Sequence, residues 1–232
     1  MTLPIPILST QDLSFTAERM TTPILQHVNL EMYPGEMVGL TGPSGEGKTT
    51  LCYCLSGIIP HSLPGYMTGE VYLGTRSLST MRLPEIARSI GLIFQDPETQ
   101  LFLPRVRNEL AFAMENLCAP PPTMRLRVEE VATELGIGRL LTRSPHELSG
   151  GEQQLVAIGS VMALDPQVLI LDEPYAQLDG GARCRLQGAV QRWKDSGKTV
   201  LLVDHRRDHL RQADKVLSMT EGRLCPLMGW PT

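Results

Sequence analysis

The chain has 232 residues and a formal net charge of −4 at pH 7, from 21 basic and 25 acidic side chains. This length allows one domain with a full hydrophobic core, and the negative charge argues against a protein that binds mainly to nucleic-acid phosphates. The sequence lacks an apolar run of the ~18 residues needed to cross a bilayer, the basic and apolar regions of a signal peptide, and a cysteine pattern typical of a disulfide framework. We therefore expect a protein of the reducing cytoplasm without a membrane span of its own.

The first part of the chain favours a small β-subdomain. Residues 1–36 and 66–80 contain short segments typical of strands, and we expect these two regions to form one subdomain. The apolar positions of the first region are Leu13, Phe15, Ile24, Val28 and Leu30.

A phosphate-binding loop follows a predicted strand at residues 36–41 and precedes a predicted helix that begins near residue 50. The pattern G-x-x-x-x-G-K-[ST] is matched at every fixed position. Its residues are Gly42, Pro43, Ser44, Gly45, Glu46, Gly47, Lys48 and Thr49, with Thr50 next in the helix. Glycines allow backbone N–H groups to turn toward phosphate oxygens, and the helix N-terminus adds partial positive charge.

Two side chains of this loop have specific expected roles. Lys48 can reach the β- and γ-phosphates of a nucleotide, and the Thr49 hydroxyl can ligate Mg²⁺. The alternative is a glycine turn before an ordinary helix, which the strand–loop–helix context disfavours. Cys52 and Cys54, behind the loop, are expected to be small core residues and not metal ligands.

Residues 96–163 predict a mostly helical subdomain. Val128, Val131 and Leu135 recur at helical spacing and Gly136 is a suitable stop, so we expect this stripe to pack in a core. Residues 119–122 read Ala-Pro-Pro-Pro and predict a loop between two helices. Further along, Ser149 and Glu152 have capping-box spacing, so Gly150 and Gly151 are expected to begin a helix. A helix N-terminus with two glycines is a second candidate anion site.

Two acids follow a short, continuously apolar strand at residues 168–171. Asp172 is expected to hold Mg²⁺, directly or through water, and Glu173 to orient or deprotonate an attacking water. A second apolar strand at 199–203 ends in Asp204 and His205, and the histidine is a candidate for contact with the γ-phosphate and the water. Taken alone, these acids would equally fit a solvated strand end, so the assignment depends on the phosphate-binding loop.

The order of these motifs resembles the ATPase domain of ABC transporters over nearly the whole chain. By that resemblance residues 42–49 are the Walker A loop, Gln95 is the Q-loop glutamine that helps to ligate Mg²⁺, and residues 168–172 are Walker B. Glu173 is then the catalytic glutamate, Asp179 the D-loop aspartate and His205 the switch histidine. The signature is the run Leu148, Ser149, Gly150, Gly151 and Glu152.

The resemblance implies an α/β fold with a RecA-like P-loop core, an antiparallel β-subdomain and a helical signature subdomain. The boundaries expected within this single domain are 1–36 and 66–80 for the β-subdomain, 37–95 and 164–220 for the core, 96–163 for the helical subdomain and 221–232 for a short tail. It also implies ATP and Mg²⁺ as ligands, with the signature of one ATPase binding the γ-phosphate held by a second.

A narrower resemblance lies after the Q-loop, in residues 94–102 and 106–116, and in residues 57–65. These segments are similar to the ATPases of energy-coupling-factor importers, which take up vitamins or metal ions. In that family the segment forms part of the groove for transmembrane partners, so the candidate contacts are Gln100, Leu101, Phe102 and Pro104. The alternative is a surface loop that packs on its own subdomain.

The implied partners are a second ATPase, identical or related, a transmembrane coupling protein and a membrane protein that captures the substrate. These partners would hold the chain at the cytoplasmic face of the membrane, and no nucleic-acid partner is expected. Two other classes remain open, a soluble ABC-type ATPase acting on DNA or ribosomes and an ATPase of another transporter class. One departure concerns the base, because Ala17 aligns where many family members carry an aromatic residue that stacks on adenine.

Overall fold

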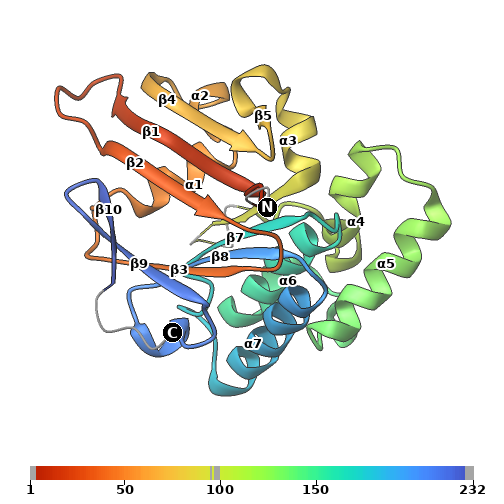
Figure 1. The fold of residues 1–232 in the computed structure, drawn as a ribbon. Coiled ribbons are helices and arrows are strands. Elements are labelled where there is room, and N and C mark those ends of the chain that lie inside the picture. The colour runs from red at the N-terminus through yellow and green to blue at the C-terminus, as the bar shows by residue number, and fades with distance from the viewer. Residues whose placement is uncertain (1–3, 95, 97–99, 228–232) are drawn as a thin grey trace.

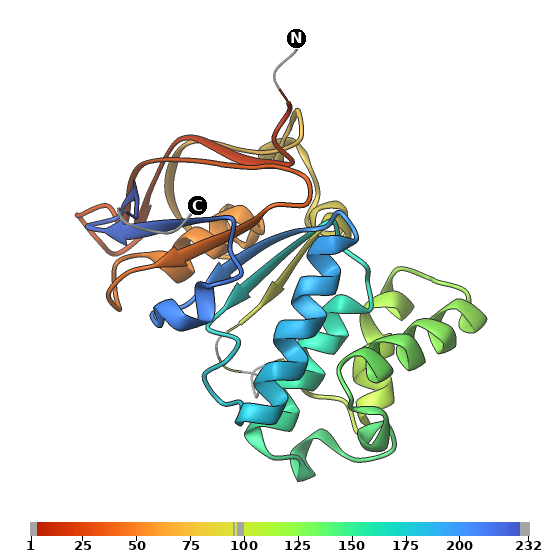
Figure 2. The ribbon, with the colours of Figure 1, turned by 60° about the horizontal axis from the view of Figure 1, so that its bottom comes forward.

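Two β-sheets organise the fold, one antiparallel and one mostly parallel (Figure 1). The structure is a computed structural model that describes residues 4–94, 96 and 100–227. Figure 2 shows helices against the face of the larger sheet that points away from the antiparallel sheet. The α/β fold class expected from the sequence is confirmed.

The antiparallel sheet has the strand order β2-β1-β4-β5. Its strands are β1 (Leu8–Ala17), β2 (Leu25–Met32), β4 (Gly65–Leu73) and β5 (Arg76–Ser77). The alternating apolar residues of β1 and β2 point to one face, as a sheet with one wet side requires. The two strand-rich regions of the sequence, before residue 36 and after residue 65, thus pair with each other.

The larger sheet has the strand order β10-β9-β3-β8-β7-β6. Its strands are β3 (Met37–Thr41), β6 (Ile90–Ile93), β7 (Val168–Asp172), β8 (Thr199–Val203), β9 (Lys215–Thr220) and β10 (Arg223–Pro226). All pairs are parallel except β9 with β10. Every residue of β3, β7 and β8 is buried, which explains their uninterrupted apolar sequences.

Seven α-helices and four 3₁₀ turns connect the strands within the described residues. The helices are α1 (Lys48–Leu55), α2 (Ile58–His61), α3 (Leu83–Ser89), α4 (Val106–Asn116), α5 (Pro121–Glu134), α6 (Gly150–Met162) and α7 (Gly180–Asp195). The 3₁₀ turns are η1 (Leu78–Thr80), η3 (Gly138–Leu140), η4 (Pro145–Glu147) and η5 (Arg207–Leu210). None of the helices in this part of the chain combines the length and apolarity needed to cross a bilayer.

The parallel sheet separates two hydrophobic cores. Alternate residues of β7 show the division: Leu169 and Leu171 pack with α4, α5, α6 and α7, whereas Val168 and Ile170 pack with α1 and the antiparallel sheet. The predicted stripe of Val128, Val131 and Leu135 lies in the first core, as expected.

One boundary expected from the sequence is wrong. Residues 119–122 were expected to form a loop, but Pro121 and Pro122 occupy the first two positions of α5. Proline is tolerated there because a first-turn residue has no intrahelical acceptor for its N–H group. The connection between α4 and α5 is therefore shorter than predicted.

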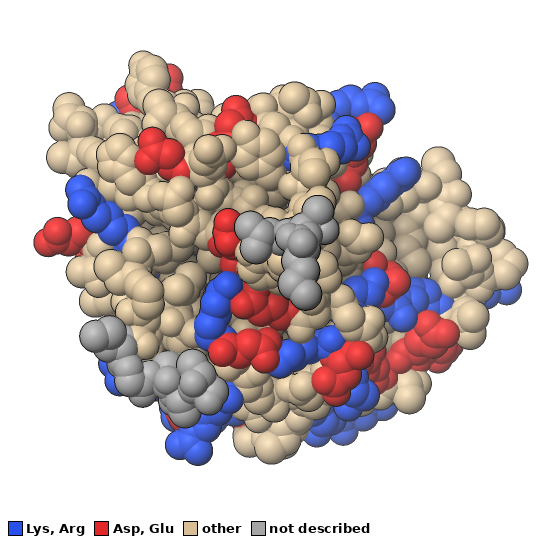
Figure 3. All heavy atoms as spheres, viewed as in Figure 1, with Lys and Arg blue, Asp and Glu red and all other residues tan. Residues whose placement is uncertain are grey.

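Basic and acidic side chains lie interspersed on the face of the molecule drawn in Figure 3. This mixing agrees with the small net charge, and the described residues form no continuous basic surface on that face. The carboxyl ends of β3, β7 and β8 meet at one edge of the parallel sheet because the three strands run side by side in the same direction. The loops that leave this edge carry the candidate site.

Candidate active site

The phosphate-binding loop joins the carboxyl end of β3 to α1. Gly42 and Gly47 have φ values of 144° and 98°, a backbone region that L side chains rarely adopt. A Cβ atom on Gly47 would also lie 2.9 Å from the carbonyl oxygen of Ile24. The path of the loop therefore depends on glycine at these positions, and it delivers the amino end of α1 to the site.

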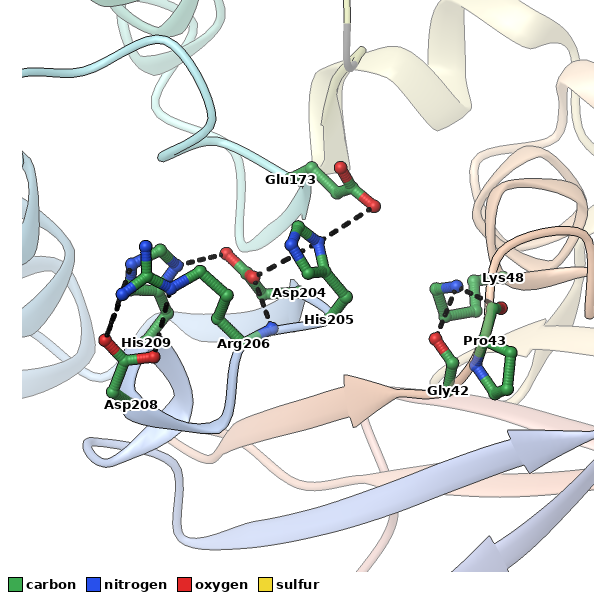
Figure 4. Close-up of polar contacts among 9 residues, drawn as sticks. All are labelled: Gly42, Pro43, Lys48, Glu173, Asp204, His205, Arg206, Asp208 and His209. Atoms are coloured by element: carbon green, nitrogen blue, oxygen red, sulfur yellow. Dashed lines mark hydrogen bonds and ion pairs between the residues drawn. The ribbon is translucent and has the colours of Figure 1, made fainter.

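Lys48 lies over this loop and is almost fully buried. Its Nζ atom donates to the carbonyl oxygen of Gly42 at 2.9 Å and to that of Pro43 at 2.7 Å (Figure 4). The loop carbonyls thus hold the ammonium group beside the amino end of α1. A phosphate oxygen that enters the loop can replace these acceptors and bind the same charge.

Thr49 and Asp172 join the phosphate loop to the carboxyl end of β7, although 123 positions separate them in sequence. The Thr49 Oγ1 atom donates to Asp172 Oδ2 at 2.6 Å. Burial raises the pKa of Asp172 above its ordinary value, the Thr49 hydrogen bond opposes this shift, and the neighbouring Glu173 carboxylate adds to it. The pair presents a hydroxyl and a carboxylate oxygen beside the phosphate loop.

Glu173 follows the last residue of β7 and has a φ of 49°, which is uncommon for a residue other than glycine. Its backbone N–H donates to the carbonyl of Val203 at 2.9 Å, so the neighbouring strand holds this conformation in place. Its carboxylate lies 3.6 Å from Nδ1 of His205, at the end of β8 (Figure 4). The acid and the histidine predicted from separate strands are thus adjacent.

A cavity of about 320 Å³ opens at this edge. It is lined by Met20, Ile24, Ser44, Gly45, Gly47, Lys48, Thr49, Thr50 and Glu173. The cavity therefore combines most of the predicted nucleotide-binding residues with the predicted catalytic acid. A larger cavity of about 540 Å³ lies between α4 and α5. Its lining contains no glycine and none of the predicted nucleotide-binding or catalytic residues, so its size does not make it the active site.

The signature residues stand outside this cavity. Ser149 caps α6 and Glu152 reaches back to it, so the predicted capping box is confirmed. The hydrogen bond from the Ser149 backbone lowers the pKa of Glu152, and Arg139 adds an ion pair at 2.9 Å. A Cβ atom on Gly151 would be 3.0 Å from the carbonyl oxygen of Gln177, just before Asp179. The signature thus packs against the predicted D-loop, where Asp179 caps α7.

Other predicted residues are placed as follows. Glu46 accepts from the backbone N–H of Glu221, and Gln95 lies outside the described residues. Leu101 is buried in the helical core, whereas Phe102 and Pro104 are exposed and the side-chain oxygen of Gln100 is buried. Leu101 therefore has little side-chain surface to offer a partner.

The carboxylate of Glu109, 3% exposed, binds the loop that carries these residues. It accepts from the backbone N–H groups of Phe102 and Leu103. A buried acid thereby holds Phe102 in its exposed position, where it packs edge-to-face on Phe112 at 5.0 Å.

Three functional candidates were missed by sequence reasoning. Met20 and Ile24 line the cavity, whereas Ala17 does not. No pattern in the sequence around Met20 distinguishes it from other residues in turns. His209 pairs with Asp204 behind His205 at 2.7 Å. Its spacing from Asp204 follows no helix or strand period, so only the path of η5 brings the two together.

Comparison with known proteins identifies the family of the chain. The family model described as ABC transporter matches residues 25–176. An ABC transporter ATP-binding protein of Streptomyces coelicolor is 40% identical over 223 residues, which cover 95% of this chain and 40% of that protein. The energy-coupling factor transporter ATP-binding protein EcfA of Methanosarcina acetivorans is 35% identical over 203 residues, covering 88% of this chain and 73% of EcfA. The chain thus spans about two fifths of the length of some curated relatives it matches.

Solved structures give the same result. The cbiO1 protein of Clostridium perfringens, part of the ABC transporter complex cbiONQ, is 30% identical with a TM-score of 0.82, covering 95% of this chain and 87% of cbiO1. A dimeric ATP-binding cassette bound to ADP and Pi has a TM-score of 0.84 at 23% identity, with coverage of 96% and 99%, and supports the fold alone. By its match to the family model over residues 25–176 and its similarity to these relatives, the chain belongs to the ABC transporter family, as a domain of the ATP-binding class that hydrolyses ATP to power transport.

Proposed function

We propose that this chain is the ATP-hydrolysing component of a membrane importer of the energy-coupling-factor type, with a vitamin or metal ion as cargo. The observation that carries the ATPase assignment is the convergence of Lys48, Thr49 and Glu173 on one cavity. Asp172 is joined to this group by its hydrogen bond with Thr49. The importer class is supported by the similarity to EcfA and cbiO1 and by the residues that follow Gln95.

The lining of the cavity supports a proposed partner for each part of ATP. The loop N–H groups and Lys48 bind the phosphates, while Met20 and Ile24 form the apolar wall against which the base rests. Glu173 orients or deprotonates the attacking water, and His205, 3.6 Å from it, contacts the γ-phosphate and the same water. Because Met20 is a thioether and not an aromatic ring, it supplies contact area without the stacking geometry of an aromatic platform.

The residues at the loop fit Mg²⁺. The Thr49 hydroxyl and the Asp172 carboxylate are oxygen donors held 2.6 Å apart, and Mg²⁺ commonly takes one or two protein oxygens and completes its shell with phosphate and water. Thr49 and Asp172 would therefore hold the ion, with Gln95 as a third candidate. When bound, Mg²⁺ would neutralise charge on the phosphates.

A second ATPase is required to complete the site. The amino end of α6 packs against the D-loop at Gln177, and Ser149, Gly150 and Gly151 do not line the cavity that contains this chain's own phosphate loop. In the proposed dimer they bind the γ-phosphate held by the other ATPase, and closure of the dimer moves the transmembrane partners.

The contact with those partners is proposed at the loop held by Glu109. Phe102 is 60% exposed there, and an exposed aromatic next to Pro104 and Gln100 provides an anchor for a transmembrane coupling protein. This contact places the chain at the cytoplasmic face of the membrane as a peripheral subunit. Identification of the membrane proteins that co-purify after mild detergent extraction tests the importer class, and recovery of an exporter or of ribosomes would contradict it.

Replacement of Glu173 by glutamine tests the ATPase assignment. Glu173→Gln keeps the size of the side chain but removes the base, so hydrolysis should fall at least ~100-fold while ATP binding persists. Gel filtration with ATP and Mg²⁺ should then show a stable closed dimer, whereas the wild-type chain reopens after hydrolysis. Unaltered hydrolysis in Glu173→Gln would remove this residue from its role.

A further inference from the structure

A second histidine lies behind His205. The Nδ1 atom of His209 is 2.7 Å from Oδ2 of Asp204, and the two side chains are only 5% and 3% exposed (Figure 4). A carboxylate can only accept, so Nδ1 is the donor. A charge-assisted hydrogen bond in so dry a setting is stronger and more rigid than the same bond in water.

The same carboxylate controls the loop that follows β8. Oδ1 of Asp204 accepts from the backbone N–H of Arg206 at 2.8 Å and lies 3.8 Å from Nδ1 of His205. One oxygen of Asp204 therefore binds η5 through His209, and the other binds the loop that contains His205. The carboxylate needs both acceptors, because each oxygen has a different partner.

His205 itself has little side-chain packing to hold it. Its ring is 56% exposed and reaches two carboxylates, that of Glu173 at 3.6 Å and that of Asp204 at 3.8 Å. The direction in which the imidazole points thus depends on where Asp204 stands, and Asp204 is held in turn by His209.

Tyr175 shields the pair from solvent. Its ring packs edge-on against the ring of His209, with centroids 5.0 Å apart and an interplanar angle of 66°. Tyr175 is 1% exposed and lies two residues after Glu173. The pair of His209 and Asp204 therefore contacts the loop that follows Glu173 through Tyr175, and it adjoins His205 through the backbone of Asp204.

We propose that His209 and Asp204 are positioning residues for ATP hydrolysis, which set the imidazole of His205 against the carboxylate of Glu173. This inference rests on the proposed ATPase activity. A positioning role can be distinguished from a purely structural one, because loss of the pair should slow turnover at saturating ATP while ATP still binds.

Two substitutions of His209 in the full-length protein test this inference. His209→Leu fills similar space but cannot donate, so it should lower kcat about tenfold with KM for ATP changed less than about twofold, since misplacing a catalytic group slows the chemical step. His209→Asn retains an N–H donor near the Nδ1 position and should recover most of the lost kcat. When His209→Leu is added to His205→Ala, kcat should fall no further than in His205→Ala alone, because the pair acts through His205.

A matched pair of substitutions provides the control. Asp12 and His27 form an exposed contact in the antiparallel sheet, with the same 2.7 Å between Nδ1 and a carboxylate oxygen as in the pair of His209 and Asp204. Asp204→Asn leaves one acceptor where two are used and should lower kcat, whereas Asp12→Asn should not. This comparison decides the question if His209→Leu fails to fold.

The inference is overturned if His209→Leu or Asp204→Asn turns over ATP at the wild-type rate, or if the loss persists undiminished without His205. A wild-type protein that does not hydrolyse ATP would overturn the proposed function, and this inference with it. Normal wild-type hydrolysis with unchanged variants would overturn the inference alone.

Discussion

In the proposed ATPase, individual side chains around the cavity would act on different parts of the nucleotide. Lys48 and the loop N–H groups are proposed to bind the phosphates, and Glu173 with His205, 3.6 Å apart, to contact the attacking water. Met20 is the proposed contact for the base, because it is 52% exposed after β1 and lines the cavity. An exposed apolar side chain at the rim of a polar cavity suits the flat, apolar face of a purine.

Removal of this side chain should weaken nucleotide binding without affecting the chemistry. We expect Met20→Ala to raise KM for ATP about fivefold (~1 kcal/mol), with kcat nearly unchanged, because sulfur–aromatic contact is lost equally from ground and transition states. GTP should be affected to the same extent, since a thioether contacts either purine. Leu126→Ala, at a side chain 63% exposed on α5, is the control, and an unchanged KM in Met20→Ala would exclude Met20 as the base contact.

At the level of secondary-structure elements, the close packing of a helix on a strand positions the signature. Helix α6, which carries the signature at its amino end, packs across β6 at Gly91. A Cβ atom on Gly91 would collide with Val161 and would lie 3.0 Å from Cγ of Pro166. The absence of a side chain at Gly91 therefore lets α6 approach the sheet.

Substitution of this glycine should destabilise the protein. Gly91→Ala overpacks the helix–strand contact and is expected to lower the free energy of unfolding by about 1–3 kcal/mol, measured by urea denaturation. Gly138→Ala is the matched control, because no atom lies within 4 Å of its added Cβ. Equal stability of the two variants would show that α6 can shift without cost.

The cap of α6 should make stability depend on pH. The pKa of Glu152 is lowered, first by the hydrogen bond from the Ser149 backbone, from an ordinary value of 4.5. A lowered folded-state pKa means that the charged cap stabilises the fold above that ordinary value and that this contribution is lost as the pH falls through the lower folded pKa. Wild-type protein should thus be more stable than Glu152→Gln at pH 7, and the difference should shrink below about pH 4.5. A constant difference in urea denaturation would contradict the ionic cap.

At the scale of the whole molecule, the proposed function is divided between two copies of the domain. The cavity contains the phosphate loop and the catalytic acid, while the signature packs on the D-loop at Gln177. In a head-to-tail dimer, each of the two sites would take its loop from one copy and its signature from the other.

Mixing two inactive variants tests this division. Lys48→Ala damages the loop and Ser149→Ala damages the signature, so a dimer of either variant alone has a defect in both sites. A mixed dimer of identical backbones has one intact site and one doubly damaged site. An equimolar mixture, in which half of the dimers are mixed, should therefore regain about a quarter of wild-type ATPase activity. No gain on mixing would indicate that signature and loop act within one copy.

The sequence by itself determined several features whose signal is local. The glycine spacing of residues 42–49, the capping box of Ser149 and Glu152 and the apolar runs of β3, β7 and β8 are readable because each signal lies within one turn or one strand. The place of Pro121 was mispredicted because a proline-rich run fits either a loop or a first helical turn.

Only the tertiary structure decided how distant segments meet. It joined Thr49 to Asp172, brought Met20 to the cavity wall, buried Leu101 while leaving Phe102 exposed, and set His209 behind Asp204. These contacts link residues through the path of the chain between them, and side-chain direction at a loop is set by packing and not by periodicity. The motifs thus identify the chemistry, while the packing around them determines which side chains can take part.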